Sequence, residues 1–266
     1  MNEFFNYNRF RNVFNFDLKN NVANFGLSVL LLSLGAVICY MVVAFMSFLY
    51  CHFTWEGGPV LAARIACFAV VSVFFFIMFP SKAYGYVTEK RMGSAYVMLP
   101  ASSTEKFISM AFNVLILFPA FYLIVYLGTD YLICLADTSC GRPLISAVAD
   151  MFTNMDMDTD GVLNVSIFRC ILSMFEILLA FLLGALYFKK RKISGVILIY
   201  LVLCILGSTI AFSYFGTHGE LFQSFDQRQT FINFASAYMW ISKVLQILVC
   251  IGLLVWVFFR VKTLKH

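Results

Sequence analysis

The chain has 266 residues, of which 62% are hydrophobic and only 12% are charged, and its formal net charge is +5. A soluble domain usually has about 25% charged and about 45–50% apolar residues. The composition therefore excludes a single water-soluble domain, because one core of this size cannot bury so much apolar surface. In lipid, the backbone polar groups must be satisfied within the chain, which leaves helices or closed barrels. The long continuous apolar runs favour helices over the short alternating strands of a barrel.

Six apolar segments are long enough to span a bilayer, since about 20 helical residues cross a hydrocarbon core of about 30 Å. The predicted spans are 25–49, 60–79, 107–127, 165–188, 193–214 and 237–259. The third predicted span could extend beyond residue 127, because residues 131–136 are also apolar. We therefore expect one all-α polytopic membrane domain over 1–266. Its external segments would be 128–164 and 215–236, the second with room for a short interfacial helix.

The distribution of basic residues predicts the orientation of the spans. Cytoplasmic loops carry an excess of Lys and Arg. With both termini inside, the cytoplasmic segments hold 14 of the 19 basic residues, namely Arg9, Arg11, Lys19, Lys82, Lys90, Arg91, Lys106, Lys189, Lys190, Arg191, Lys192, Arg260, Lys262 and Lys265. This predicts the N-in, C-in arrangement and gives no reason to expect nucleic-acid binding. Within the spans, Arg64, Arg169 and Lys243 are expected to extend toward the outer surface.

The N-terminal segment 1–22 differs from the spans and predicts an interfacial amphipathic helix. Tyr7, Phe10, Phe14 and Leu18 recur at helical spacing, with asparagine and basic residues between them. The alternative is a disordered, Asn-rich tail. We favour the helix, because the five phenylalanines among the first 16 residues would be poorly solvated in a free tail.

Glu176 lies near the middle of the fourth predicted span. A carboxylate at that depth is costly unless it faces a cavity or a partner, so Glu176 is a candidate intramembrane functional residue. The alternative is a protonated glutamate that is hydrogen-bonded to a neighbouring helix.

The external segment 128–164 contains two further patterns. Cys134 and Cys140 could form a disulfide if that face is oxidising, or could remain free thiols. The sequence Asp-x-Asp-x-Asp-Gly at 156–161 resembles the start of a calcium loop. Such a loop needs a bidentate acid at its twelfth position, which here is Ile167. We therefore expect a solvated acidic loop and no metal site.

The segment 81–106 is long for a loop that joins two adjacent helices. Ser102 and Glu105 fit a capping box, so a helix is expected to begin there and run into the third span. Pro100 would end the preceding element. The sequence thus predicts a short amphipathic helix, a break and a capped helix, an arrangement suited to docking another protein.

The order of residues in this segment resembles the permease subunits of ABC-2 type ATP-binding-cassette exporters. Glu-Lys-Arg-x-Gly at 89–93 precedes an apolar run, Leu-Pro-Ala-Ser at 99–102 and Glu-Lys at 105–106. In that family an acidic-basic-glycine stretch after the second span leads to a leucine-proline-x-serine turn. The family also has an N-terminal interfacial helix, six spans and cytoplasmic termini. The long acidic segment 128–164 departs from the family pattern.

The resemblance implies a permease in a bacterial cytoplasmic (inner) membrane, paired with a second permease copy or paralogue and with an ABC ATPase subunit. It implies that the ATPase docks on 81–106. The implied coupling residues are Tyr84, Tyr86, Glu89, Lys90, Arg91 and Gly93, and the turn and helix cap are Pro100, Ser102 and Glu105. The chain has no GxxxxGK[ST] phosphate loop, so ATP and magnesium would bind to the partner, and no directly bound cofactor or enzymatic activity is expected.

An ATPase-independent secondary transporter or a membrane scaffold is the alternative function. An intramembrane enzyme is disfavoured, because His52, His218 and His266 lie in loops or the tail and no second buried acid accompanies Glu176. The sequence selects neither the cargo nor a homodimer over a heterodimer.

Overall fold

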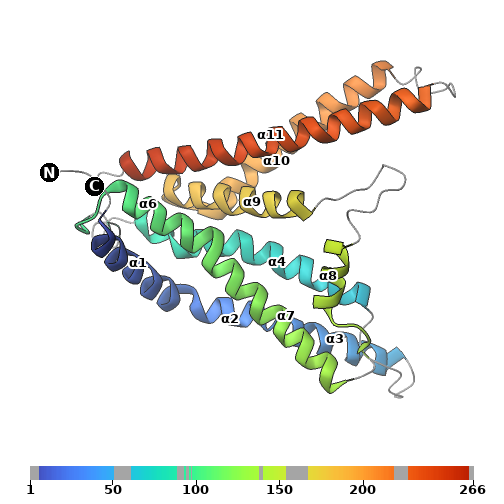
Figure 1. Ribbon diagram of the computed structural model, residues 1–266, viewed down its shortest axis with the longest axis horizontal. Helices are drawn as coiled ribbons and strands as arrows, with labels where there is room; N and C mark the ends of the chain where they lie inside the picture. The colour runs from blue at the N-terminus through green and yellow to red at the C-terminus, as the bar shows by residue number, and fades with distance from the viewer. Residues whose placement is uncertain are drawn as a thin grey trace.

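The computed structural model describes residues 6–50, 61–88, 93, 96, 98–137, 140–153, 167–218 and 227–263. The regular secondary structure of these residues is entirely helical, which confirms the all-α class. Figure 1 shows the long helices running side by side, with both termini at one end of the bundle. The α-helices are α1 (Tyr7–Asn21), α2 (Leu27–Ser33), α3 (Gly35–Tyr50), α4 (Leu61–Ala83), α6 (Ser103–Phe112), α7 (Phe118–Ala136), α8 (Leu144–Thr153), α9 (Ile167–Tyr187), α10 (Lys192–His218) and α11 (Gln227–Thr263).

Five helical segments are long and apolar enough to cross a membrane. They are Tyr7–Met46, Leu61–Ala83, Ser103–Ala136, Cys170–Tyr187 and Val244–Thr263. They overlap five of the six predicted spans. The predicted fifth span lies in α10, where the apolar stretch among the described side chains is the shorter segment Lys192–Leu206. Six spans with cytoplasmic termini therefore stay a prediction.

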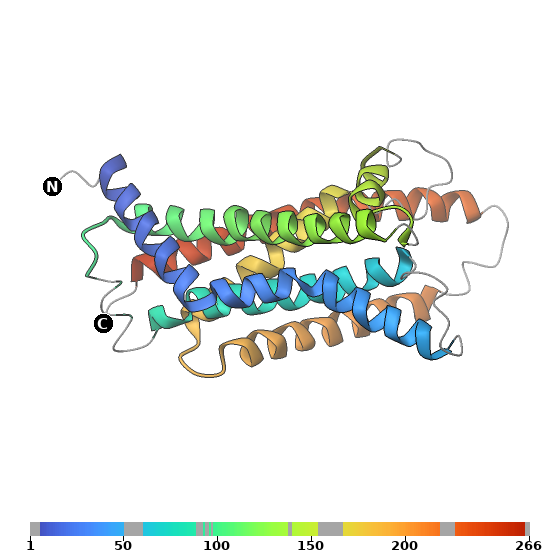
Figure 2. The same ribbon diagram turned by 90° about the horizontal axis from the view of Figure 1, so that it is seen from below.

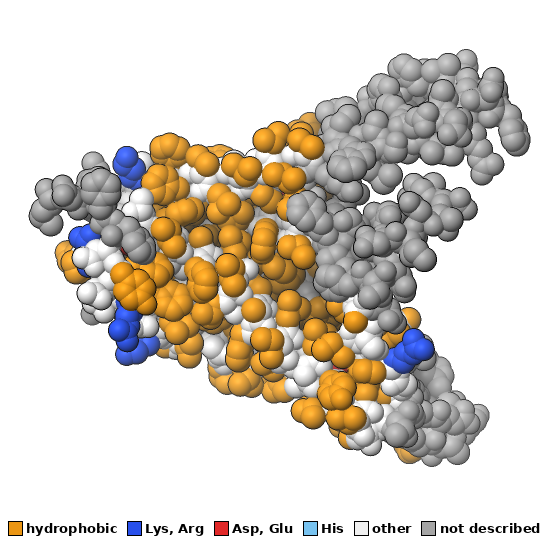
Figure 3. Space-filling view, viewed as in Figure 1, with side chains coloured by type: hydrophobic (Ala, Val, Ile, Leu, Met, Phe, Trp, Pro, Cys, Tyr) orange, Lys and Arg blue, Asp and Glu red, His pale blue; other side chains and the backbone are white. Residues whose placement is uncertain are grey.

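The surface of the bundle suits a lipid environment. Large apolar side chains are widely exposed, including Leu27 at 73% and Ile124 at 71%. Figure 3 shows hydrophobic side chains across the middle of one face and Lys and Arg side chains toward its ends. A soluble monomer rarely exposes a continuous apolar surface of this extent.

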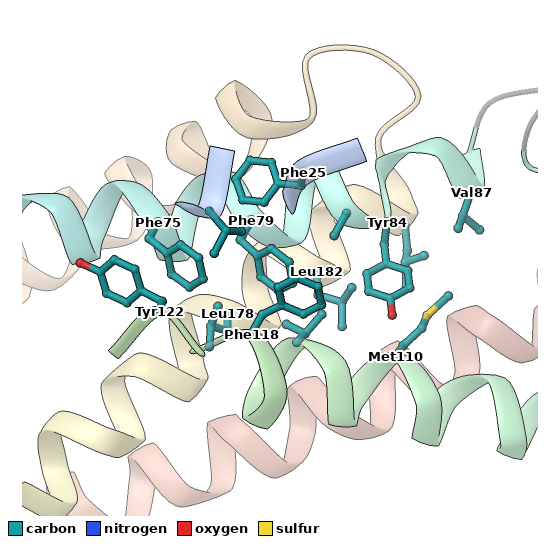
Figure 4. Close-up of a cluster of buried hydrophobic side chains, with 14 of the residues drawn as sticks. Phe25, Phe75, Phe79, Tyr84, Val87, Met110, Phe118, Tyr122, Leu178 and Leu182 are labelled. Atoms are coloured by element: carbon teal, nitrogen blue, oxygen red, sulfur yellow. The ribbon is translucent and has the colours of Figure 1, made fainter. Parts of the chain in front are cut away.

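An aromatic core joins α4 to α7 (Figure 4). The rings of Phe75 and Tyr122 stack with their centroids 4.4 Å apart, and those of Phe79 and Phe118 stack at 4.6 Å. Leu178 of α9 closes the cluster, and all five side chains are at most 4% exposed. Stacked aromatic pairs contribute about 0.5–1.5 kcal/mol each beyond the area that they bury.

The predicted N-terminal helix is present as α1, and it buries polar residues beside its half-buried apolar residues Phe10, Phe14 and Leu18. Its buried residues are Val13, Asp17 and Asn21, whereas Tyr7 is 68% exposed. The helix does not end near residue 22: a π-helical turn, η1 (Val22–Gly26), leads directly into α2. Figure 2 shows α1 inclined to α2, so the direction of the helix changes across this turn.

The third predicted span ends too early. The helix from Ser103 continues to Ala136 through a π-helical turn, η3 (Asn113–Leu117). Asp130 does not end it, because that carboxylate is buried and paired with Arg64. The apolar residues 131–136 therefore extend the helix, which was the open alternative.

Three other predicted boundaries shift. α4 includes Ser81, Lys82 and Ala83, and a 3₁₀ turn, η2 (Gly85–Thr88), follows it. The segment 128–164 contains the end of α7 and the short helix α8. α11 begins at Gln227, so the predicted boundary at 237 falls inside one continuous helix. The acidic sequence at 156–161 lies outside the described residues.

A glycine lets α9 approach α10 closely. A Cβ atom on Gly184 would lie 2.0 Å from Cγ2 of Val196, which is far inside van der Waals contact. A larger residue fits at this point only if the Val196 side chain or one of the two helices shifts.

Candidate functional site

The helix that follows the segment 81–106 is capped as the sequence predicts. Ser102 Oγ accepts a hydrogen bond from the Glu105 backbone N–H (3.2 Å), and Glu105 Oε2 accepts one from the Ser102 N–H (2.9 Å). This reciprocal pair satisfies two N–H groups that the first turn of a helix leaves without partners. Pro100 lies in the bend just before it.

Glu105 also holds the beginning of α1. Its Oε1 accepts a hydrogen bond from the Asn6 N–H (2.8 Å) and lies 3.3 Å from the Arg9 guanidinium. The Glu105 side chain is completely buried. Backbone N–H groups and the positive end of the helix stabilise the carboxylate there, and Arg9 adds an opposite charge. The start of α6 and the N-terminus of α1 are thereby joined.

A second polar contact fastens the same two helices one turn further along. The Asp17 carboxylate of α1 accepts a hydrogen bond from Ser109 Oγ of α6, and both side chains are completely buried. Lys106 is only 8% exposed and lies near Asp17, and its Nζ is 5.6 Å from the centre of the Tyr96 ring. Buried charges are retained only where partners of this kind compensate for lost hydration.

Tyr84 lies at the centre of this polar cluster. Its hydroxyl oxygen accepts hydrogen bonds from the side-chain amides of Asn21 (3.2 Å) and Asn113 (3.3 Å). Asn21 immediately precedes the π turn η1, and Asn113 begins the π turn η3. Burial raises the pKa of Tyr84 well above its ordinary value, so the phenol stays neutral.

The turn η2 connects the cluster to the α9–α10 connection. Lys192 Nζ at the start of α10 donates a hydrogen bond to the Gly85 carbonyl. Thr88 Oγ1 lies 3.5 Å from the Phe188 carbonyl just after α9. The Tyr86 ring meets the Tyr96 ring edge-on, with the centroids 6.2 Å apart.

The predicted coupling residues therefore have two different placements. Tyr84 and Gly93 are buried and Tyr86 is 9% exposed, so the two tyrosines pack inside the chain and do not offer a docking surface of their own. The sequence 89–91, which supplies the charges of the predicted contact, lies outside the described residues. The partners of Tyr84 were missed because Asn21 is one of several asparagines in its segment and Asn113 is a single amide within the third predicted span, so no spacing marks their contact.

Glu176 faces a cavity of about 430 Å³ between α9, α10 and α11. The other residues that line the cavity are aliphatic or aromatic, and Tyr200 and Trp256 are among them. Gln246 Nε2 of α11 donates to Glu176 Oε2 (3.3 Å) and lies 2.8 Å from Ser173 Oγ. Glu176 therefore faces a cavity and is hydrogen-bonded to a neighbouring helix, and its functional role stays a prediction.

At the opposite end of the bundle, the expected outward extension of Arg64 is wrong. Arg64 is 3% exposed, and its Nη1 lies 3.0 Å from Asp130 Oδ1 and 2.7 Å from Cys134 Sγ. Its Nη2 donates to the carbonyls of Cys140 (3.1 Å) and Arg142 (2.5 Å). These acceptors compensate for the hydration that the buried guanidinium loses. The same expectation for Arg169 and Lys243 concerns side chains outside the described ones.

Asp130 completes this second cluster. Its Oδ2 accepts a hydrogen bond from the Leu144 N–H (2.7 Å) at the first residue of α8, so one carboxylate joins α4, α7 and α8. Cys134 and Cys140 are free thiols in the structure. Among the described residues, no group of three or more His, Cys, Asp and Glu side chains is arranged to hold a metal ion.

No protein-family model, curated protein or solved structure matches the chain.

Proposed function

We propose that the chain is the membrane-spanning permease subunit of an ATP-driven ABC exporter in a bacterial cytoplasmic membrane. A separate ATPase subunit would bind at the end of the bundle that carries the termini, and a second permease copy or paralogue would complete the transporter. The partner would supply the ATP site and magnesium, since the chain has no phosphate-loop sequence.

The observation that carries the proposal is the attachment of the segment 81–106 to three other parts of the bundle. Glu105 joins it to α1, Tyr84 joins it to both π turns, and Lys192 joins it to the α9–α10 connection. A displacement of this segment by a docked ATPase would therefore move several spans together. Elements that move as packed units are what rigid-body switching in a transporter requires.

The burial of Tyr84 and Tyr86 gives these residues a particular role in the proposal. They position the segment from inside, and the charged residues Glu89, Lys90 and Arg91 make the contact with the ATPase. Gly93, Pro100 and the capped start of α6 set the path of the chain between the contact and the third span.

Co-purification tests the proposal. The chain is expressed with a phosphate-loop ATPase from the same genome as the candidate partner, and charges are reversed at Glu89, Lys90 and Arg91. We expect the ATPase to be lost from the purified complex and ATP-dependent transport to be lost with it. The matched control is Arg142→Glu, an exposed residue near the opposite end of the bundle, which leaves the complex intact. Retention of the ATPase by the triple variant would contradict the proposal.

A second candidate is transport without an ATPase, and Glu176 is the observation that favours it. A single carboxylate in an otherwise apolar cavity is suited to binding a proton or a cationic cargo. The two functions separate in vesicles that contain the chain alone. Uptake driven by a proton gradient and abolished by Glu176→Gln would favour the second function, whereas uptake only with ATP and the ATPase would favour the first.

A further inference from the structure

A groove of about 670 Å³ lies between the end of α4, the turn η2 and the start of α10. Figure 2 shows α4 and α10 side by side near the end of the bundle that carries the termini, where these two helices are in contact. The groove is distinct from the Glu176 cavity, with which it shares no lining residue.

The groove is strongly basic. Lys82, Arg191 and Lys192 line it, and no Asp or Glu is among the lining residues. Lys82 and Arg191 are exposed to solvent at its mouth, whereas Lys192 is half-buried and bonds to the Gly85 carbonyl. The acid that acts on Tyr86 is Asp17, whose buried carboxylate is hydrogen-bonded to Ser109 of α6. A groove lined by three basic residues and no acidic ones attracts an anion.

One buried hydroxyl group that lines the same groove makes no hydrogen bond. Ser81 is 6% exposed and its Oγ has no partner. Tyr86, which also lines the groove, is 9% exposed, and the Asn20 side chain is the partner of its hydroxyl. Buried polar groups are rarely left unpaired in native proteins, and an exception points to an ordered water, a ligand or an ion.

A serine in a helix can bond to a backbone carbonyl of the same helix, so the helical position of Ser81 does not explain why its hydroxyl has no partner. Ser72, on the same helix α4, donates to the carbonyl four residues back, that of Phe68, at 2.6 Å. The Ser81 hydroxyl makes no such bond and lines the groove instead. Arg191 is also kept in an unusual conformation, since its φ of 52° lies in the region that favours glycine.

The remaining wall of the groove is apolar and continues onto the outside of the bundle. Ile193 and Ile197 of α10 line the groove, and Ile197 is 45% exposed. Beyond it, Leu198 and Leu201 are more than half exposed on the same helix. A ligand that fits both parts has an anionic head and a hydrocarbon tail.

We propose that this groove binds the phosphate group of an acidic phospholipid, with an acyl chain along α10. Arg191 and Lys82 neutralise the phosphate, while Ser81 donates a hydrogen bond to one of its oxygens. The lipid would hold the start of α10 against η2, where Lys192 already bonds to Gly85. This inference does not depend on the transport function, because it concerns the lipid that surrounds the chain.

Lipid binding to the purified full-length chain tests the proposal. Native mass spectrometry measures the binding of phosphatidylglycerol, phosphatidylcholine and inorganic phosphate in a neutral detergent. We expect phosphatidylglycerol to bind about tenfold more tightly than phosphatidylcholine, since each basic residue near an anionic lipid contributes a several-fold gain. Millimolar inorganic phosphate should not displace it. Equal affinity for the two lipids, or displacement by free phosphate, would overturn the assignment to an acidic lipid.

Variants separate the groove from general charge attraction. Arg191→Gln should lower the affinity for phosphatidylglycerol about five-fold or more, whereas Lys189→Gln and Lys190→Gln remove exposed charges of the same loop that do not line the groove. Ser81→Ala removes the unpaired hydroxyl with little change of shape and should also weaken binding. An equal loss in the Lys189 and Lys190 variants, or full binding by Ser81→Ala, would refute the site.

Discussion

Asn21 and Asn113 donate hydrogen bonds to one atom, the hydroxyl oxygen of Tyr84, although they belong to helices that are far apart in the sequence. Each asparagine stands where its helix changes from the α to the π form. π turns inside α-helices often lie at functional sites. The two π turns among the described residues thus meet at a residue of the predicted coupling segment.

Replacement of Tyr84 by phenylalanine should destabilise the chain. It leaves two buried amide groups without an acceptor, and a buried unpaired donor costs about 1–3 kcal/mol. The control is Tyr96→Phe, because Tyr96 is equally buried but its hydroxyl has no hydrogen-bond partner. Denaturant titration in detergent should give a lower free energy of unfolding for the first variant and an unchanged or higher one for the second. Equal effects would show that the shared oxygen adds no stability.

The Arg64–Asp130 pair should behave as a unit. Both side chains are 4% exposed, so Arg64→Met or Asp130→Leu alone leaves an uncompensated buried charge, at a cost of about 3–5 kcal/mol. The double variant should lose much less free energy of unfolding than the two single variants lose together. Arg11→Met removes an exposed charge and serves as the control, with little effect. Additive losses in a double-mutant cycle would contradict the coupling of the two residues.

Gly184→Ala should disturb the contact between α9 and α10. The new Cβ would lie 2.0 Å from Val196 Cγ2, and overpacking of this kind costs about 1–3 kcal/mol. Val196→Ala removes the clashing methyl groups, so the double variant should recover most of the stability that Gly184→Ala loses. Gly252→Ala in α11 is the matched control, because no heavy atom lies within 4 Å of its Cβ position. There the substitution should be neutral or stabilising by up to about 1 kcal/mol.

Cys140 should react slowly with maleimides at neutral pH. Burial, with smaller effects from Cys134 and Asp137, raises the pKa of its thiol from 9.0 to about 11. The raised pKa keeps the thiol protonated, so the reactive thiolate is about a hundredfold scarcer near pH 8. In a chain whose only cysteine is Cys140, the labelling rate should keep rising up to about pH 11. The denatured chain provides the control, with a rate that levels off near pH 9; levelling at the same pH in the folded chain would contradict the shift.

The parts of the fold that depend on local sequence could be predicted. Long apolar runs identified the helices that can cross a membrane, and the spacing of Ser102 and Glu105 identified a capping box. Each of these patterns is formed by residues that are close together in the sequence. The prediction that α1 is a helix and not a disordered tail is also confirmed.

The parts that depend on long-range pairing could not be predicted. Arg64 and Asp130 are 66 residues apart, and each alone looks like a charge that should reach water. Asp17 is completely buried against α6, and no pattern in the sequence marks Ser109 as its partner. The apolar side chains of Phe10, Phe14 and Leu18 are half-buried beside it, so α1 buries both apolar and polar residues.

The bond between Asn6 and Glu105 has a consequence for synthesis of the chain. Its two residues are separated by 99 positions. A ribosome adds about 5–20 residues per second, so α1 is present for roughly 5–20 seconds before the carboxylate that anchors it is made. During that interval Arg9 and Asp17 have no α6 beside them and must stay hydrated or be held by other factors. α1 therefore reaches its final place only after α6 has been translated.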